Sequence, residues 1–179
     1  MVLLLLFSIL LLAAGLAILV KRWPRGWQHS FSQHAAQTRS ATAYYAILFV
    51  LALVPLNIFM FGWFIPAFQM PIMLGFLLLL SSILQIACTL LPEKGRTVKI
   101  HRQLAGASAL LLLPSLGLIY AGNSSASARI AITIGVVLMI GTMLWFALDR
   151  QKRTPYLLQV VCYLGFFGPL IWIALGGLK

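Results

Sequence analysis

Long apolar runs separated by short polar stretches dominate the pattern of this 179-residue chain. Six runs have a length of about 20 residues, at which a helix crosses the hydrocarbon core of a membrane. They cover residues 2–20, 44–64, 70–91, 104–121, 129–148 and 156–177. The alternating ten-residue segments of membrane barrels are absent, and backbone groups in lipid must be satisfied within each segment. The sequence therefore predicts an all-α polytopic membrane protein, a bundle of six transmembrane helices.

The polar remainder is too short to form a separate soluble domain. The longest connection, residues 21–43, spans a couple of dozen residues, so we expect a single transmembrane domain over residues 1–179. The first apolar run has no basic segment before it, and Lys21 and Arg22 follow it directly. We therefore expect a retained helix rather than a signal peptide.

Composition and the placement of charge predict how the helices are oriented across the membrane. Apolar residues make up 62% of the chain and charged residues only 8%, with a net charge of +11. Three alternate connections between the spans hold eleven of the thirteen basic residues: Lys21, Arg22, Arg25 and Arg39; Lys94, Arg96, Lys99 and Arg102; and Arg150, Lys152 and Arg153. Because short basic loops stay in the cytoplasm, we expect these connections to be cytoplasmic and both termini outside the cell membrane.

This topology accounts for the positive charge without a nucleic-acid partner. Basic residues at the inner boundary attract anionic lipid, and the chain shows no basic face with base-stacking or groove-reading elements. We therefore expect membrane lipid as a partner and exclude nucleic acid. The sequence leaves open whether the chain forms a homo-oligomer.

Acidic residues are too few for carboxylate chemistry within the membrane. Glu93 and Asp149 are the only two, and both lie in connections beside basic residues. No ionisable residue falls at the middle of a span, which disfavours a proton-coupled transporter. Phosphate-binding and nucleophile-elbow motifs are also absent, so we expect a protein that is not an enzyme and has no cofactor.

The three histidines support an alternative from a different class. His29, His34 and His101 fall on the cytoplasmic side and are candidate metal ligands for an intramembrane hydrolase. A second alternative is a haem with His34 and His101 as its two axial ligands. A step of five residues from His29 to His34 separates them by about 140° on a helix, which is poor geometry for one metal. We favour interfacial histidines bonded to backbone or headgroups.

Polar residues in the inner halves of the spans provide the candidate binding site. Ser81 and Gln85 share one helix face, and Ser108 and Gln159 lie at similar depth. Prolines Pro55, Pro114 and Pro169 lie within the three spans that run from inside to outside. One interpretation is interhelical hydrogen bonding. The other is a vestibule open to the cytoplasm, with these prolines as its roof and Ser81, Gln85, Ser108, His101 and Gln159 as ligand-binding residues.

The stretch LPEKGRTVKIHRQLAG, residues 91–106, combines both signs of charge with a histidine. We expect Pro92 to end the third helix, Thr97 to contribute a cap and His101 to lie in the first turn of the fourth helix. Glu93 should pair with a nearby base. We expect His101 to anchor this loop against the segment that contains Ser32 and His34.

Three stretches together resemble a known family. They are HSFSQHAAQTRSATAYYAILF, FIPAFQMP and LLPEKGRTVKIHRQLAGASALLLLP, with Ser32 and Ala36 leading into helix 2, and Pro92, His101 and Ala105 opening helix 4. Their order is similar to that of a prokaryotic six-helix membrane family of unknown function, itself distantly similar to the DRAM and Sfk-like membrane proteins. The resemblance implies the six-helix fold. Because the eukaryotic relatives are associated with lipid and stress processes, it also implies lipid as the ligand class.

These observations together predict a non-enzymatic binding or scaffolding protein with a polar vestibule that faces the cytoplasm. The expected ligand is a lipid or a small amphipathic molecule. The alternative is the metal-dependent hydrolase built on the three histidines.

Overall fold

The structure is a computed structural model that describes residues 1–26, 28–148 and 155–176. Its helices are α1 (Val2–Arg22), α2 (Phe31–Ala35), α3 (Arg39–Phe59), α4 (Ile65–Ala67), α5 (Ile72–Leu90), α6 (Val98–Gly122), α7 (Ala126–Leu148) and α8 (Pro155–Gly176). The described part of the chain contains no strand. Six helical stretches are long and apolar enough to cross a membrane, which confirms the all-α prediction and the six long apolar helices expected as spans.

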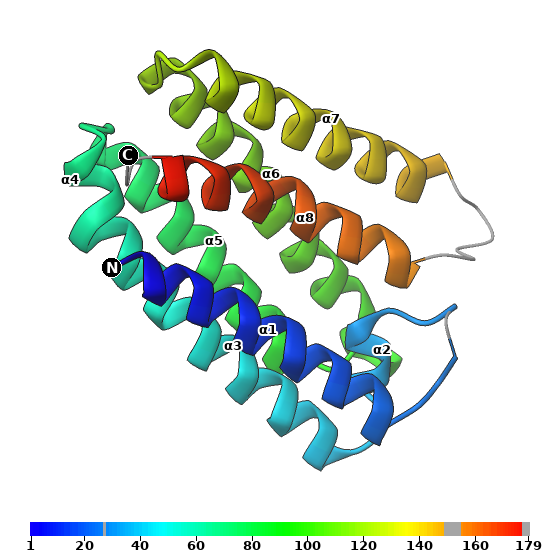
Figure 1. Cartoon of the computed structure of the whole chain (residues 1–179). Helices are drawn as coiled ribbons and strands as arrows, with labels where there is room; N and C mark the ends of the chain where they lie inside the picture. Colours follow the sequence, from blue (N-terminus) through cyan, green and yellow to red (C-terminus); the bar gives the residue numbers. More distant parts are fainter. Residues whose placement is uncertain (27, 149–154, 177–179) are drawn as a thin grey trace.

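The six long helices form a closed ring in chain order (Figure 1). Each long helix packs against the next one, and α1 packs against α8 to close the ring. The most extensive contacts are within the pairs α5 and α6, α7 and α8, and α1 and α3. Short connections favour this arrangement because they force consecutive helices to run antiparallel as neighbours.

The second span is longer than its apolar run predicts. It begins at Arg39 because the Thr38 hydroxyl caps the helix and accepts a 3.1 Å hydrogen bond from the Ala41 amide. At its other end α3 continues through a π-helical turn, Met60–Phe64, into α4. Pro55 lies inside α3 without ending it, as expected for proline in a membrane helix.

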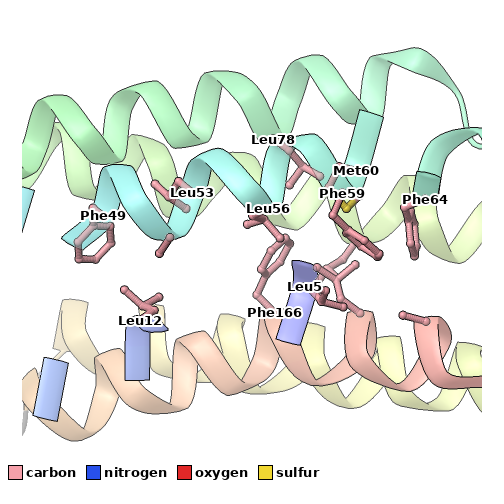
Figure 2. Packing of buried hydrophobic residues seen from close by; sticks show 14 of the residues in the cluster. Leu5, Leu12, Phe49, Leu53, Leu56, Phe59, Met60, Phe64, Leu78 and Phe166 are labelled. Carbon is pink, nitrogen blue, oxygen red and sulfur yellow. The ribbon is translucent and has the colours of Figure 1, made fainter. Parts of the chain in front are cut away.

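Large apolar side chains fill the centre of the ring (Figure 2). They come from four helices and the π-helical turn: Leu5, Leu12, Phe49, Leu53, Leu56, Phe59, Met60, Phe64, Leu78 and Phe166. Aromatic contacts such as the 5.8 Å pair of Phe59 and Phe64 rings add to this packing. The centre is therefore a packed core made of residues from well-separated parts of the sequence.

Two glycines allow α7 and α8 to approach closely. A Cβ atom on Gly135 would clash with the carbonyl oxygen of Gly165 and with the ring of Pro169. Such small residues let membrane helices pack by van der Waals contact. Pro169 is buried at this interface whereas Pro114 is exposed, so the three span prolines do not roof one interior space as the vestibule hypothesis requires.

Candidate functional site at the basic end of the bundle

The end of α1, the short helix α2, and the starts of α3, α6 and α8 meet at one end of the ring (Figure 1). We call this the basic end because the first and third connections bring eight basic residues there: Lys21, Arg22, Arg25, Arg39, Lys94, Arg96, Lys99 and Arg102. The other three basic residues that we expect on this side, Arg150, Lys152 and Arg153, lie outside the described residues, as do Asp149 and Lys179. Arg129 lies at the opposite end, near the start of α7.

The first connection folds back into the basic end rather than extending over its surface. Ser30 starts α2 with a capping box, in which its hydroxyl accepts from the Gln33 amide and the Gln33 side chain accepts from the Ser30 amide. The Phe31 ring lies 4.6 Å from the Tyr156 ring, and the Phe31 amide donates a 3.0 Å hydrogen bond to Oε1 of Gln159. The short helix α2, which packs against α1 and α3, is therefore also joined to α8.

Glu93 joins the first connection to the third. Its Oε2 accepts hydrogen bonds from the hydroxyls of Ser30 at 2.9 Å and Ser32 at 2.6 Å, and its Oε1 accepts one from Nε of Arg102 at 3.0 Å. The side chain is only 8% exposed. We call Ser30, Ser32, Glu93 and Arg102 the Glu93 hub, and it confirms the expected pairing of Glu93 with a nearby base.

The hub keeps this carboxylate ionised. Burial raises the pKa of Glu93, but the hydrogen bonds from Ser32, Ser30 and Arg102 and the nearby charge of His101 together outweigh burial and lower the pKa below its ordinary value. A group with a lowered pKa is a weak base at neutral pH. The hub is therefore suited to joining segments and poorly suited to activating the serines as nucleophiles.

The His101 side chain has a local role. It lies in the first turn of α6, as predicted, is 4% exposed and has its Nδ1 2.6 Å from the Leu91 carbonyl oxygen. Because a carbonyl oxygen only accepts, Nδ1 carries the proton. We expected His101 to anchor the loop to the segment of Ser32 and His34. This prediction is wrong, because Glu93 and not His101 makes that link.

Two neighbouring expectations have mixed outcomes. Pro92 lies just beyond the end of α5 at Leu90, as expected. Thr97 precedes α6, but its hydroxyl donates to the Pro92 carbonyl oxygen at 2.6 Å and makes no cap bond to the helix. Thr97 therefore stabilises the loop rather than the helix start.

The candidate vestibule residues are used in separate contacts. The hydroxyls of Ser81 and Ser108 lie 3.0 Å apart, and each also donates to the other's backbone carbonyl. Gln159 accepts from the Phe31 amide, while Gln85 is half-buried on α5. The structure thus brings Ser81 and Ser108 together as an interhelical pair and places Gln159 and His101 in contacts with other segments.

The three histidines do not gather around a common point. His34 donates through Nδ1 to the Trp23 carbonyl oxygen at 2.7 Å, while His101 is bonded to Leu91 on another connection. Within residues 1–26, 28–148 and 155–176, no group of three histidine, cysteine or acidic side chains is placed to hold a metal ion. No observation of the described chain therefore favours the hydrolase alternative.

An open groove lies between the start of α3 and the end of α5. Its volume is about 540 Å³ and its lining is Thr38, Arg39, Thr42, Ala43, Ala46, Leu90, Pro92 and Lys94. The two alanines, three residues apart on one helix face, leave the space that larger side chains would fill. We call this the α3–α5 groove; its floor is apolar and its two charged residues, Arg39 and Lys94, are both basic and exposed.

A second hollow of about 260 Å³ lies between α7 and α8. Its lining is apolar apart from Thr142 and includes the exposed ring of Trp145. It has no charged residue to orient a ligand. The α3–α5 groove is therefore the better candidate for a binding site.

Sequence reasoning missed both the hub and the groove. The spacing of Ser30 and Gln33 matches a capping box, and this signal could have placed a helix before Arg39. The alanines at the start of α3, beside Arg39, could likewise have suggested a hollow at the membrane boundary. Neither signal identifies the partner segment, which comes from the far end of α5.

Comparisons of the chain with protein-family models, with curated proteins and with solved structures found no match. The resemblance to the prokaryotic six-helix family therefore stays a prediction.

Proposed function

We propose that this chain is a multi-pass protein of the cell membrane that binds a membrane lipid in the α3–α5 groove and catalyses no reaction. The observation that carries the proposal is the groove itself, with its apolar floor and basic rim at one end of two membrane-spanning helices. A volume of about 540 Å³ falls in the range of about 300–1,000 Å³ that small-molecule sites occupy.

The order of polar and apolar groups along the groove matches that of a lipid. Arg39 is the first residue of α3 and Lys94 lies four residues beyond the end of α5, so both are at the membrane boundary. Ala43 and Ala46 lie deeper, within α3, and Leu90 is the last residue of α5. A lipid headgroup at the rim would therefore place its acyl chain along an apolar surface.

The orientation forms part of the same proposal. The basic end faces the cytoplasm because short loops rich in lysine and arginine are retained there, and both termini then lie outside. The lipid accordingly enters sideways from the inner leaflet. A sideways entrance also agrees with the packed core and with the mutual bonding of Ser81 and Ser108, which leave the interior vestibule without support.

Native mass spectrometry of the detergent-purified protein tests the proposal by counting retained lipids. Ala43→Phe places a ring in the groove, and Ala147→Phe is the matched control because Ala147 is an exposed alanine near the basic-end terminus of α7. We expect the first variant to lose the lipid and the second to retain it.

A second groove variant protects against a folding artefact. Leu90→Trp fills the same groove from α5, where Leu90 is 62% exposed, and should also release the lipid. Unchanged lipid retention in both groove variants, with native helical content and elution volume, would show that the groove is not the binding site.

A further inference from the structure

We infer that the lipid in the α3–α5 groove is an anionic phospholipid, with its phosphate held between Arg39 and Lys94. This inference rests on the proposed function and adds the chemical class of the headgroup. It depends on the charge of the groove, whereas the proposed function depends on its shape and position.

No residue in the described part of the chain neutralises the two basic residues at the rim. Neither Arg39 nor Lys94 makes an ion pair with any residue that the structure describes. Glu93 directly precedes Lys94, but its two oxygens are bonded to Ser30, Ser32 and Arg102. The groove is thus left with two positive charges and no acidic residue in its lining.

Hydroxyl groups of the groove are already engaged within α3 and its connection. The Thr42 hydroxyl donates to the carbonyl oxygens of Ala35 and Thr38 at 3.0 and 3.1 Å, and the Thr38 hydroxyl lies 3.0 Å from that of Ser40. The two side chains that remain to orient a headgroup are therefore cationic. Arginine binds phosphate oxygens in pairs through its planar guanidinium, and lysine adds a point charge.

The rim is also held in place before any ligand binds. Lys94 lies on a short connection fixed by the Glu93 hub and by the Thr97 hydroxyl, which donates to the carbonyl oxygens of Pro92 at 2.6 Å and Lys94 at 2.9 Å. Arg39 starts α3 directly after its cap, Thr38. The backbone that carries both cations is therefore fixed before a ligand binds, which lowers the ordering cost of binding to that of the two side chains.

A zwitterionic choline lipid fits this lining poorly. Its quaternary ammonium needs an aromatic face or an acidic group, and the groove lining has neither. Inorganic phosphate fits the rim but leaves the floor at Ala43, Ala46 and Leu90 uncovered. An anionic phospholipid satisfies both parts of the groove.

Competition in native mass spectrometry tests the headgroup. The protein is mixed with phosphatidylglycerol and phosphatidylcholine of identical acyl chains, and we expect the phosphatidylglycerol adduct to dominate. Arg39→Gln with Lys94→Gln should reduce that preference by about thirtyfold, because each basic residue near an anionic surface contributes about 1 kcal/mol. Lys21→Gln with Arg22→Gln removes the same charge from the end of α1, outside the groove, and should retain the preference.

The outcomes separate this inference from the proposed function. Equal retention of both lipids by the unmodified protein would overturn the anionic headgroup and leave the lipid groove intact. Retention of neither lipid would overturn both. Displacement of phosphatidylglycerol by inorganic phosphate at equal concentration would show that the rim alone binds, which also contradicts a lipid site.

Discussion

The hydroxyl of Ser32 donates a 2.6 Å hydrogen bond to Oε2 of Glu93, which lies 61 residues later in the chain. This contact ties the connection before α3 to the connection after α5. Arg39, which follows the first of these connections as the first residue of α3, and Lys94, which lies on the second, are the cations of the α3–α5 groove. The position of the groove rim therefore depends on a hub that lies beside it.

Replacement of Glu93 should destabilise the bundle. Glu93→Gln removes the ion pair with Arg102 and weakens the bonds from Ser30 and Ser32, at a cost of about 2–3 kcal/mol, since hydrogen bonds to a charged group are the stronger ones. Thermal unfolding in detergent measures the change. Lys99→Gln, an exposed residue of the same segment, is the control, and equal midpoints for the two variants would contradict the role of the hub.

Acid should weaken the protein through the same carboxylate. The pKa of Glu93 in the folded protein is below the ordinary value of 4.5, because hydrogen bonds from Ser32, Ser30 and Arg102 outweigh the effect of burial, which by itself raises it. A lowered pKa gives stability that is fully present above about pH 4.5 and lost as the pH falls through the folded pKa. The unfolding midpoint should therefore fall more steeply in this range for the unmodified protein than for Glu93→Gln. If the unfolding midpoints of the unmodified protein and of Glu93→Gln fell equally with pH, Glu93 would not be the source of the acid sensitivity.

The close contact of α7 and α8 predicts different effects for two glycines. Gly135→Ala forces a Cβ against the Gly165 carbonyl, and overpacking of this kind costs about 1–3 kcal/mol. Gly141→Ala, on the same helix, meets no atom within 4 Å and should leave stability unchanged or slightly improved. The free energy of unfolding of both variants is measured in mixed detergent. An equal loss of stability in the two would show that α7 and α8 are not as close at Gly135 as described.

The Ser81 and Ser108 pair should contribute to packing and not to ligand binding. A double-mutant cycle with alanine at both positions should give a coupling of about 0.6 kcal/mol, typical of a hydrogen bond between membrane helices. Lipid retention in native mass spectrometry should stay unchanged in the double variant. Loss of the lipid would instead favour the interior vestibule.

Cysteine labelling on intact cells tests the orientation. In a background with Cys88 and Cys162 replaced by alanine, we expect a cysteine at Ser124, between α6 and α7, to react with an impermeant reagent and one at Arg96 to be protected. Both positions are exposed in the structure. Protection at Arg96 would therefore mean that the membrane, and not the protein, keeps the reagent from this position. The reverse pattern would place the basic end outside, against the charge rule.

The six spans could be predicted from the sequence because a membrane imposes its demands on each segment separately. An apolar run of sufficient length must be helical in lipid, whatever its neighbours are. Helix ends were less predictable where a polar side chain decides them. Thr38 moves the start of α3 to Arg39, and Thr97, which looked like a cap, bonds to Pro92 instead.

Only the tertiary structure decided which polar groups meet. Depth in the membrane correctly marked Ser81, Ser108 and Gln159 as polar residues in need of a partner, but depth does not give the direction in which a side chain points around the ring. Ser81 meets Ser108, Gln159 meets the Phe31 amide, and Glu93 meets Ser32. These pairs depend on how the helices rotate against each other and how α2 folds back between them, and no pattern within a single segment carries that information.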